Sequence, residues 1–164
     1  MYILIGSDGF IGGWLKEEID EYKIRFITTF TIKNRLRDNL HRFKGVDNID
    51  GIFVLGGASS SPMYFGKDCP NSYDLTIEPL LSAMEISLLS EAPIVYATTS
   101  HTTHAEFGYT CAMSAREILA KGFHKETGIS IIGTSFYSVF GSGEWKKQQK
   151  ISMKISKYLK TGDF

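Results

Sequence analysis

The chain has 164 residues, 43% of them hydrophobic and 22% charged, and its formal net charge is zero. These values are typical of one globular domain with a single core, and the balanced charge gives no indication of a nucleic-acid or membrane-surface partner. No apolar run approaches the roughly 20 residues of a membrane span. The two cysteines lack metal-ligand spacing and Met1 leads directly into a strand, so we expect a reduced, cytoplasmic protein.

The first elements surround a glycine-rich turn. Tyr2–Ile5 is a short apolar run that predicts a strand, and apolar residues at three- and four-residue spacing after the turn predict an amphipathic helix. Gly6, Gly9 and Gly12 follow the G-x-x-G-x-x-G spacing, which lets a pyrophosphate approach the backbone at a helix start. We therefore predict a dinucleotide site here, with a glycine turn that binds no ligand as the alternative. The candidate contact residues are Gly6, Ser7, Asp8, Gly9, Phe10, Ile11 and Gly12.

A second predicted strand, Lys23–Thr29, bears on the type of dinucleotide. In nicotinamide-nucleotide proteins an acidic residue often ends this strand and holds the adenosine ribose hydroxyls. This chain has Thr29 there, and the basic residues Lys33, Arg35 and Arg37 follow. With Thr29 as a contact, these residues favour the 2′-phosphate of NADP over the free hydroxyl of NAD, although a solvated basic helix face explains the same charges.

A second set of small residues follows a buried strand. Ile52–Leu55 is a continuous apolar run, as expected of a strand that is buried on both faces in a parallel sheet. Gly56, Gly57 and Ala58 come next, and their small size would let a cofactor lie against the backbone. Further candidate cofactor contacts are therefore Leu55, Gly56 and Gly57.

The remaining segments alternate between helix and strand patterns. A loop is predicted over Met63–Asn71, and a helix over Asp74–Leu89 has Pro79 as a kink or a late start. The other predicted elements are a short helix at Asn34–Phe43, a strand at Pro93–Ala97, a long helix at Phe107–Thr127, a strand that begins at Ile129 and a polar helix at Lys146–Leu159. This alternation predicts an α/β fold, a Rossmann-like, doubly wound parallel sheet with helices on both faces.

Five motifs, in this order, resemble one known family. They are GSDGFIG in the first turn, DGIFVLGGASS at Asp50–Ser60, VYATTS at Val95–Ser100, Tyr109 at a helix start with Glu117 further along, and ISIIGTSFYSVFGSG at Ile129–Gly143. Together they resemble the extended short-chain dehydrogenases and reductases, which include nucleotide-sugar epimerases, dehydratases and reductases. The resemblance covers nearly the whole chain and implies a single NAD(P)-binding domain over residues 1–164.

The resemblance also implies an active site and an assembly. In the family a tyrosine moves a proton while hydride moves to or from the nicotinamide, which makes Tyr109 the candidate acid or base. Thr99 would hydrogen-bond the oxygen of the substrate, which is expected to be a nucleotide sugar or a related polyol. Family members commonly dimerise through two helices, represented here by Asp74–Leu89 and Phe107–Thr127, so we expect a homodimer.

Several departures from the family pattern concern this site. Met113 occupies the place of the family's lysine beside the cofactor, and Ser135 occupies the place of an arginine. Only nine residues separate Thr99 from Tyr109, whereas the family normally has a longer substrate-contacting loop there. The family's substrate-binding subdomain would begin within residues 145–164. A phenol has a pKa near 10 and needs a cation beside it to exchange protons near neutrality. The thioether of Met113 supplies no charge.

Two functions remain open at this point. The first is an NAD(P)-dependent epimerase, dehydratase or reductase, in which an imidazole of His101 or His104 could act as the acid or base. The second is a non-catalytic dinucleotide-binding or interaction protein that kept the fold without the chemistry. No metal site is expected, because His101, His104 and Cys111 have no fourth ligand at suitable spacing.

Overall fold

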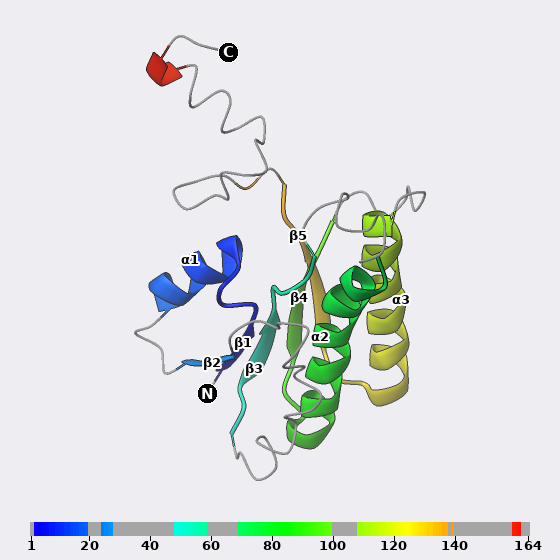
Figure 1. The fold of residues 1–164 in the computed structure, drawn as a ribbon. Coiled ribbons are helices and arrows are strands. Elements are labelled where there is room, and N and C mark those ends of the chain that lie inside the picture. The colour runs from blue at the N-terminus through cyan, green and yellow to red at the C-terminus, as the bar shows by residue number, and fades with distance from the viewer. Residues whose placement is uncertain are drawn as a thin grey trace.

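The computed structural model describes residues 2–19, 24–27, 48–58, 69–99, 108–137, 139 and 159–161. Helices and strands alternate along the chain (Figure 1). In chain order the elements are β1 (Tyr2–Ile5), α1 (Phe10–Ile19), β2 (Ile24–Ile27), β3 (Gly51–Val54), α2 (Cys69–Ser90), β4 (Ile94–Thr98), α3 (Gly108–Thr127) and β5 (Ile131–Ser135). The strands form one parallel five-stranded sheet in the order β2-β1-β3-β4-β5.

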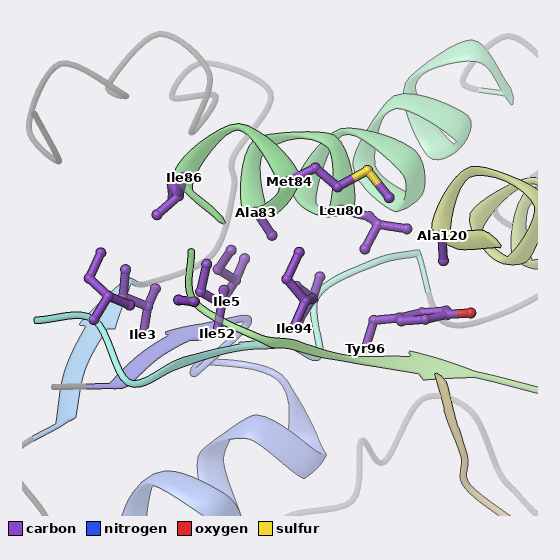
Figure 2. Packing of buried hydrophobic residues seen from close by; sticks show 13 residues of the cluster. Ile3, Ile5, Ile52, Leu80, Ala83, Met84, Ile86, Ile94, Tyr96 and Ala120 are labelled. Carbon is purple, nitrogen blue, oxygen red and sulfur yellow. The ribbon is translucent and has the colours of Figure 1, made fainter. Parts of the chain in front are cut away.

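Helices cover both faces of the sheet. α1 lies on one face, while α2 and α3 lie side by side on the other (Figure 1). The close view of the core shows the same arrangement, with α2 and α1 on opposite sides of the strands (Figure 2). The predicted Rossmann-like, doubly wound parallel sheet is therefore confirmed. Among the helices of the described ranges, none combines the length and the apolar character that crossing a bilayer requires.

The main core fills the space between the sheet and the α2 face (Figure 2). Isoleucine side chains from β1, β3 and β4 meet apolar side chains of α2, and Tyr96 lies beside Ala120 of α3. The labelled members are Ile3, Ile5, Ile52, Leu80, Ala83, Met84, Ile86, Ile94, Tyr96 and Ala120. β-Branched side chains favour strands because they pack well on a pleated surface. This packing fixes the carboxyl ends of β1, β3 and β4, where the candidate site residues follow.

The second helix begins earlier than its sequence pattern predicts. The loop predicted over Met63–Asn71 is wrong at its end because α2 begins at Cys69, and the late start at Pro79 is wrong for the same reason. Pro70 stands in the first turn, where a helix does not need its N–H group. Pro79 lies inside α2 and is buried, so packing of the apolar face sustains the helix on both sides of the proline.

The other predicted elements differ from the observed ones by one or two residues at their bounds. β3 ends at Val54 rather than Leu55, and β5 begins at Ile131 rather than Ile129. α3 ends before Gly128, which has a φ of +75° and closes the helix as a left-handed cap. The helix predicted at Asn34–Phe43 lies outside the described residues, as does most of the one predicted at Lys146–Leu159.

The strand order reverses at β1. Although β2 follows β1 in the chain, β3 returns to the opposite side of β1. In parallel sheets such a reversal opens a crevice beyond the carboxyl ends of the strands, and ligands bind there. Ile5 and Val54, which end β1 and β3, are register partners. Gly6 and Leu55 therefore leave the sheet next to each other.

Candidate functional site

Gly6 and Gly56 meet at this reversal of the strand order through their backbones. Gly6 has a φ of +95°, a conformation that L side chains rarely adopt. A Cβ atom at Gly6 would lie 2.7 Å from the Cα of Gly56 and 2.8 Å from the carbonyl carbon of Leu55. The Ile5 carbonyl accepts hydrogen bonds from the amides of Leu55 (2.8 Å) and Gly56 (3.1 Å). Glycine at position 6 therefore allows the ends of β1 and β3 to pack backbone against backbone.

Gly12 allows a second close approach, between α1 and the turn. A Cβ atom there would lie 2.7 Å from the carbonyl carbon of Gly6 and 3.1 Å from the Cα of Ser7. Gly9 differs, because the nearest atom to its Cβ position is the Gly6 carbonyl oxygen at 3.4 Å, an ordinary contact. Packing within the protein explains glycine at positions 6 and 12, and it leaves space at position 9.

The start of α1 offers hydrogen-bond donors next to that space. The Gly9 amide donates to the Gly6 carbonyl (3.2 Å), and the first helical bond runs from the Gly13 amide to the Gly9 carbonyl (2.7 Å). Amides of the first turn have no preceding helical carbonyl to bind. These first-turn amides belong to Phe10, Ile11 and Gly12. Together with the helix dipole, they suit an anionic group such as a pyrophosphate.

The loop after β3 lies against both α2 and α3. The Ala58 amide donates to the Thr76 hydroxyl oxygen on α2 (3.0 Å), and both residues are buried. A Cβ atom at Gly57 would lie 3.5 Å from the same oxygen and 3.7 Å from Nη1 of Arg116 on α3. These contacts hold the loop after β3 against α2 and α3, beside the turn that Gly6 begins.

Thr99 and Tyr109, the two predicted catalytic residues, are brought together. Thr99 directly follows β4 and is buried, and Tyr109 lies in the first turn of α3. Their side chains are hydrogen-bonded to each other. Tyr109 also packs against the small cluster that Ala58, in the loop after β3, forms with Ala112. Burial raises the pKa of Tyr109, while the Arg116 guanidinium and the Thr99 hydrogen bond lower it.

Met113 and Arg116 follow Tyr109 on the same face of α3. Met113 is 6% exposed and carries no charge, whereas Arg116 is 1% exposed and places a cation near the phenol. Sequence reasoning missed Arg116. The available signal was its spacing, since it falls seven residues after Tyr109 among the buried positions Ala112, Met113 and Ala120.

Several predicted residues cannot be placed relative to this site. Thr29, the basic residues after it, and both loop histidines, His101 and His104, lie outside the described residues. Within the described ranges, no group of three His, Cys, Asp or Glu side chains could hold a metal ion. The preference between NAD and NADP stays a prediction.

Comparison with known proteins finds similar structures but no matching family model or curated sequence. A mutant UDP-glucuronic acid 4-epimerase from Bacillus cereus, solved with a UDP-sugar and NAD, is 16% identical with a TM-score of 0.79, over 99% of this chain and 64% of that one. A mutant dTDP-glucose 4,6-dehydratase from Streptomyces venezuelae, solved with NAD, is 11% identical with a TM-score of 0.78, over 99% and 62%.

A third similar structure has a different substrate. It is L-threonine dehydrogenase from Clostridium difficile, 15% identical with a TM-score of 0.66, over 83% of this chain and 52% of that one. The chain thus spans less than two thirds of the length of each of these enzymes. At these sequence identities the structural likeness establishes the fold, whereas function has to be argued from the residues of the site. The chain therefore shares its parallel α/β fold with these three enzymes.

Proposed function

We propose that this chain forms the NAD(P)-binding part of an epimerase, dehydratase or reductase that acts on a nucleotide sugar or a related polyol. The observation that carries the proposal is the close backbone packing of Gly6 on Gly56 and of Gly12 on the turn, which leaves space at Gly9 beside the first turn of α1. A pyrophosphate would lie in front of Gly9, beside the first-turn amides of α1. Residues 55–57 and Met113 would border the rest of the cofactor. Two of the similar structures are nucleotide-sugar enzymes, which supports that substrate class.

Side chains of this chain would carry out the proton transfer. When bound, a nicotinamide supplies the hydride chemistry of such a reaction. Tyr109 carries a proton on its phenol oxygen at neutral pH, because the ordinary pKa of a phenol is near 10 and burial raises that of Tyr109 above it. Thr99 orients that oxygen through the hydrogen bond between the two side chains. A protonated, oriented phenol is suited to donate a proton to a substrate oxygen.

The proposal also includes a preference for NADP over NAD. Thr29 and the basic residues after it favour NADP, whereas the similar epimerase and dehydratase were solved with NAD. We expect both dinucleotides to bind, with NADP the tighter of the two. A clear preference for NAD in titration would overturn the expectation for NADP and leave the proposed site in place.

A non-catalytic dinucleotide-binding protein is the second candidate function. Met113 favours it, because a buried thioether stands one helical turn from Tyr109, where a charged side chain would assist proton transfer. Both candidates require dinucleotide binding, and they differ in turnover. Conversion of UDP-glucose, UDP-glucuronic acid or dTDP-glucose to another sugar nucleotide in the presence of NAD, NADP or their reduced forms, followed by chromatography, would support the enzyme, because an epimerase or dehydratase returns the hydride to its product and accumulates no reduced cofactor.

Gly9→Ala tests the proposed site. Because the Cβ of an alanine at position 9 would make only an ordinary contact with the protein, the variant should fold and should fill the space that the pyrophosphate needs. We expect the dissociation constant to rise by about tenfold or more, equivalent to about 1.4 kcal/mol. Calorimetric titration with NAD, NADH, NADP and NADPH measures it.

Gly13→Ala is the matched control on the same helix. Its Cβ would lie 3.8 Å from the Ser7 carbonyl oxygen, and alanine favours a helix interior. This variant should bind as the wild type does. If the wild type binds none of the four dinucleotides at millimolar concentration, or if both variants bind like it, the proposed site is wrong.

We further propose that α2 and α3 form a homodimer interface. Four large apolar side chains on these helices are exposed, namely Leu81, Leu88 and Leu89 on α2 and Ile118 on α3. We also propose a cytoplasmic location, because the two cysteines follow neither a disulfide-scaffold nor a metal-site pattern.

A further inference from the structure

Arg116 places a buried positive charge at the carboxyl end of β3. Its side chain is 1% exposed, and arginine is rarely buried this far unless hydrogen bonds compensate for the lost hydration. Nη1 donates to the Gly56 carbonyl (3.4 Å) and Nη2 donates to the Val54 carbonyl (3.3 Å). The guanidinium carbon lies 5.6 Å from the centre of the Tyr96 ring. The charge is therefore held by two backbone carbonyls and one aromatic face.

The same guanidinium borders the segment that Tyr109 contacts. Nη1 lies 3.7 Å from the position of a Cβ at Gly57, and Tyr109 packs against the cluster that the next residue, Ala58, forms with Ala112. Helical side chains tilt toward the N-terminus, so Arg116 reaches back toward the start of α3, where the phenol is. The Arg116 guanidinium and the Tyr109 side chain, which lie seven residues apart on α3, are therefore both near residues 56–58.

We propose that Arg116 supplies the fixed positive charge that stabilises the ionised form of Tyr109 in the candidate active site. It acts as a positioning residue, because its burial keeps it from touching a substrate. The catalytic meaning of this role rests on the proposed function, whereas the electrostatic coupling between the two side chains does not. An arginine remains charged at any pH at which the protein folds, so its stabilisation of ionised Tyr109 does not depend on the charge state of Arg116 changing with pH.

The electrostatic environment of both phenols supports the proposal. Burial raises the pKa of Tyr109, and Arg116 is the larger of the two groups that oppose it, with the Thr99 hydrogen bond second. Burial also raises the pKa of Tyr96, the Glu117 carboxylate raises it further, and Arg116 lowers it. Arg116 thus acts on two phenols, while Thr99 acts on one.

Other polar groups lie near the pair. From β4, the Thr98 hydroxyl donates to a Glu117 carboxylate oxygen (2.7 Å), and Tyr73 of α2 packs against the cluster of Ala58 and Ala112 that Tyr109 also contacts. Among the described residues, the titratable and charged groups shown to face Tyr109 are therefore Arg116 on α3 and Tyr73 on α2, whereas Glu117 acts on Tyr96 of β4.

The experiment follows the ionisation of Tyr109 in the full chain without cofactor. The chain has eight tyrosines, so NMR of protein with labelled tyrosine ring carbons is needed, with Tyr109→Phe and Tyr96→Phe to assign the two signals. In Arg116→Met, which removes the charge and keeps an apolar side chain of similar length, both phenols should ionise at higher pH than in the wild type. Arg116→Lys keeps a charge and loses the planar fork, so Tyr109 should titrate near its wild-type value.

Thr99→Val is the matched control. It removes the hydrogen bond without touching the guanidinium, so the pKa of Tyr109 should rise and that of Tyr96 should stay unchanged. Arg116→Gln replaces Arg116→Met if the latter does not fold, because its amide retains one donor for the β3 carbonyls. Circular dichroism of each variant checks the fold.

Two results would overturn the proposal. One is an unchanged Tyr109 pKa in a folded variant without the charge, and the other is an equal rise in Arg116→Lys and Arg116→Met, which would make Arg116 a packing residue only. Since no cofactor enters these titrations, their outcome is independent of the Gly9→Ala result. Loss of dinucleotide binding in every assay would remove the proposed function and leave the coupling of Arg116 to Tyr109 to be decided by the titration.

Discussion

Asp8 puts a carboxylate into the turn where a pyrophosphate is proposed to bind. Partial burial raises the pKa of this carboxyl, and a hydrogen bond with its own backbone lowers it. A negative charge beside an anion opposes binding. We expect Asp8→Asn to tighten dinucleotide binding by about threefold, in keeping with the fraction of a kcal/mol typical of exposed charge pairs.

Titration of Asp8→Asn with NADP at low and high salt measures this effect, which should shrink as salt screens the charge. Glu17→Gln, an exposed site further along α1, is the control and should bind like the wild type. Weaker binding in Asp8→Asn would mean that the Asp8 carboxylate contacts the ligand, for example through a ribose hydroxyl.

Two phenols, the buried Tyr96 and the partly buried Tyr109, make stability depend on pH. Burial raises the pKa of both Tyr96 and Tyr109 in the folded protein above the value near 10 of an unfolded chain. Their contribution to the free energy of unfolding is therefore fully present below about pH 10 and is lost as the pH rises through the folded pKa values. We expect urea denaturation to show a decline above about pH 10, and Tyr109→Phe should make that decline shallower. Parallel curves for the two proteins would contradict this assignment.

At the scale of elements, Thr76 joins α2 to the loop after β3. Its hydroxyl accepts the hydrogen bond of the Ala58 amide, and the residue is fully buried. Thr76→Val keeps the shape of the side chain and leaves that buried amide without its acceptor. We expect urea denaturation to show a loss of about 1–3 kcal/mol, the usual cost of an unsatisfied buried donor. Dinucleotide affinity should fall with it, because residues 55–57 lose their support.

Ser82→Ala is the control for the same helix. Ser82 donates to a Glu78 carboxylate oxygen (2.8 Å), a bond that stays within α2 and joins no other element. We expect a smaller loss of stability than in Thr76→Val and no change in dinucleotide affinity. Equal losses of affinity in the two variants would mean that α2 supports the site as a whole rather than through Thr76.

At the scale of the whole molecule, the exposed apolar side chains of α2 and α3 bear on assembly. Leu88 is 56% exposed and Ile118 is 71% exposed. If the two helices form a homodimer interface, burying these side chains contributes to its stability. We expect light scattering to give twice the mass of the 18.4 kDa chain, and we expect Leu88→Glu to yield the single-chain mass.

Ile132→Glu is the matched control for this prediction. Ile132 is 59% exposed, but it lies on β5 rather than on the proposed interface. This variant should retain the dimer. A wild-type protein with the mass of one chain at high concentration would remove the homodimer from the proposal.

Local patterns are sufficient for most elements and for their order. Apolar runs bounded by turn residues mark β1 and β3, and the alternation of strands with helices leaves few topologies other than a doubly wound parallel sheet. The start of α2 is different. Pro70 and its polar neighbours carry no helical pattern, and the helix extends to Cys69 because the rest of α2 is held by its packing on the sheet.

The sequence by itself determined the glycine turn and the fold class, because these depend on short motifs and on their order along the chain. The hydrogen bond between Thr99 and Tyr109 was decided by the tertiary structure. Only the tertiary structure decided that Gly56 lies against Gly6 and that Arg116 binds carbonyls 60 and 62 residues away. The strand pairing of β1 with β3 and the packing of α3 bring these groups together. A buried guanidinium is tolerated only where such carbonyls already converge, so its partners are a property of the assembled sheet rather than of any local pattern.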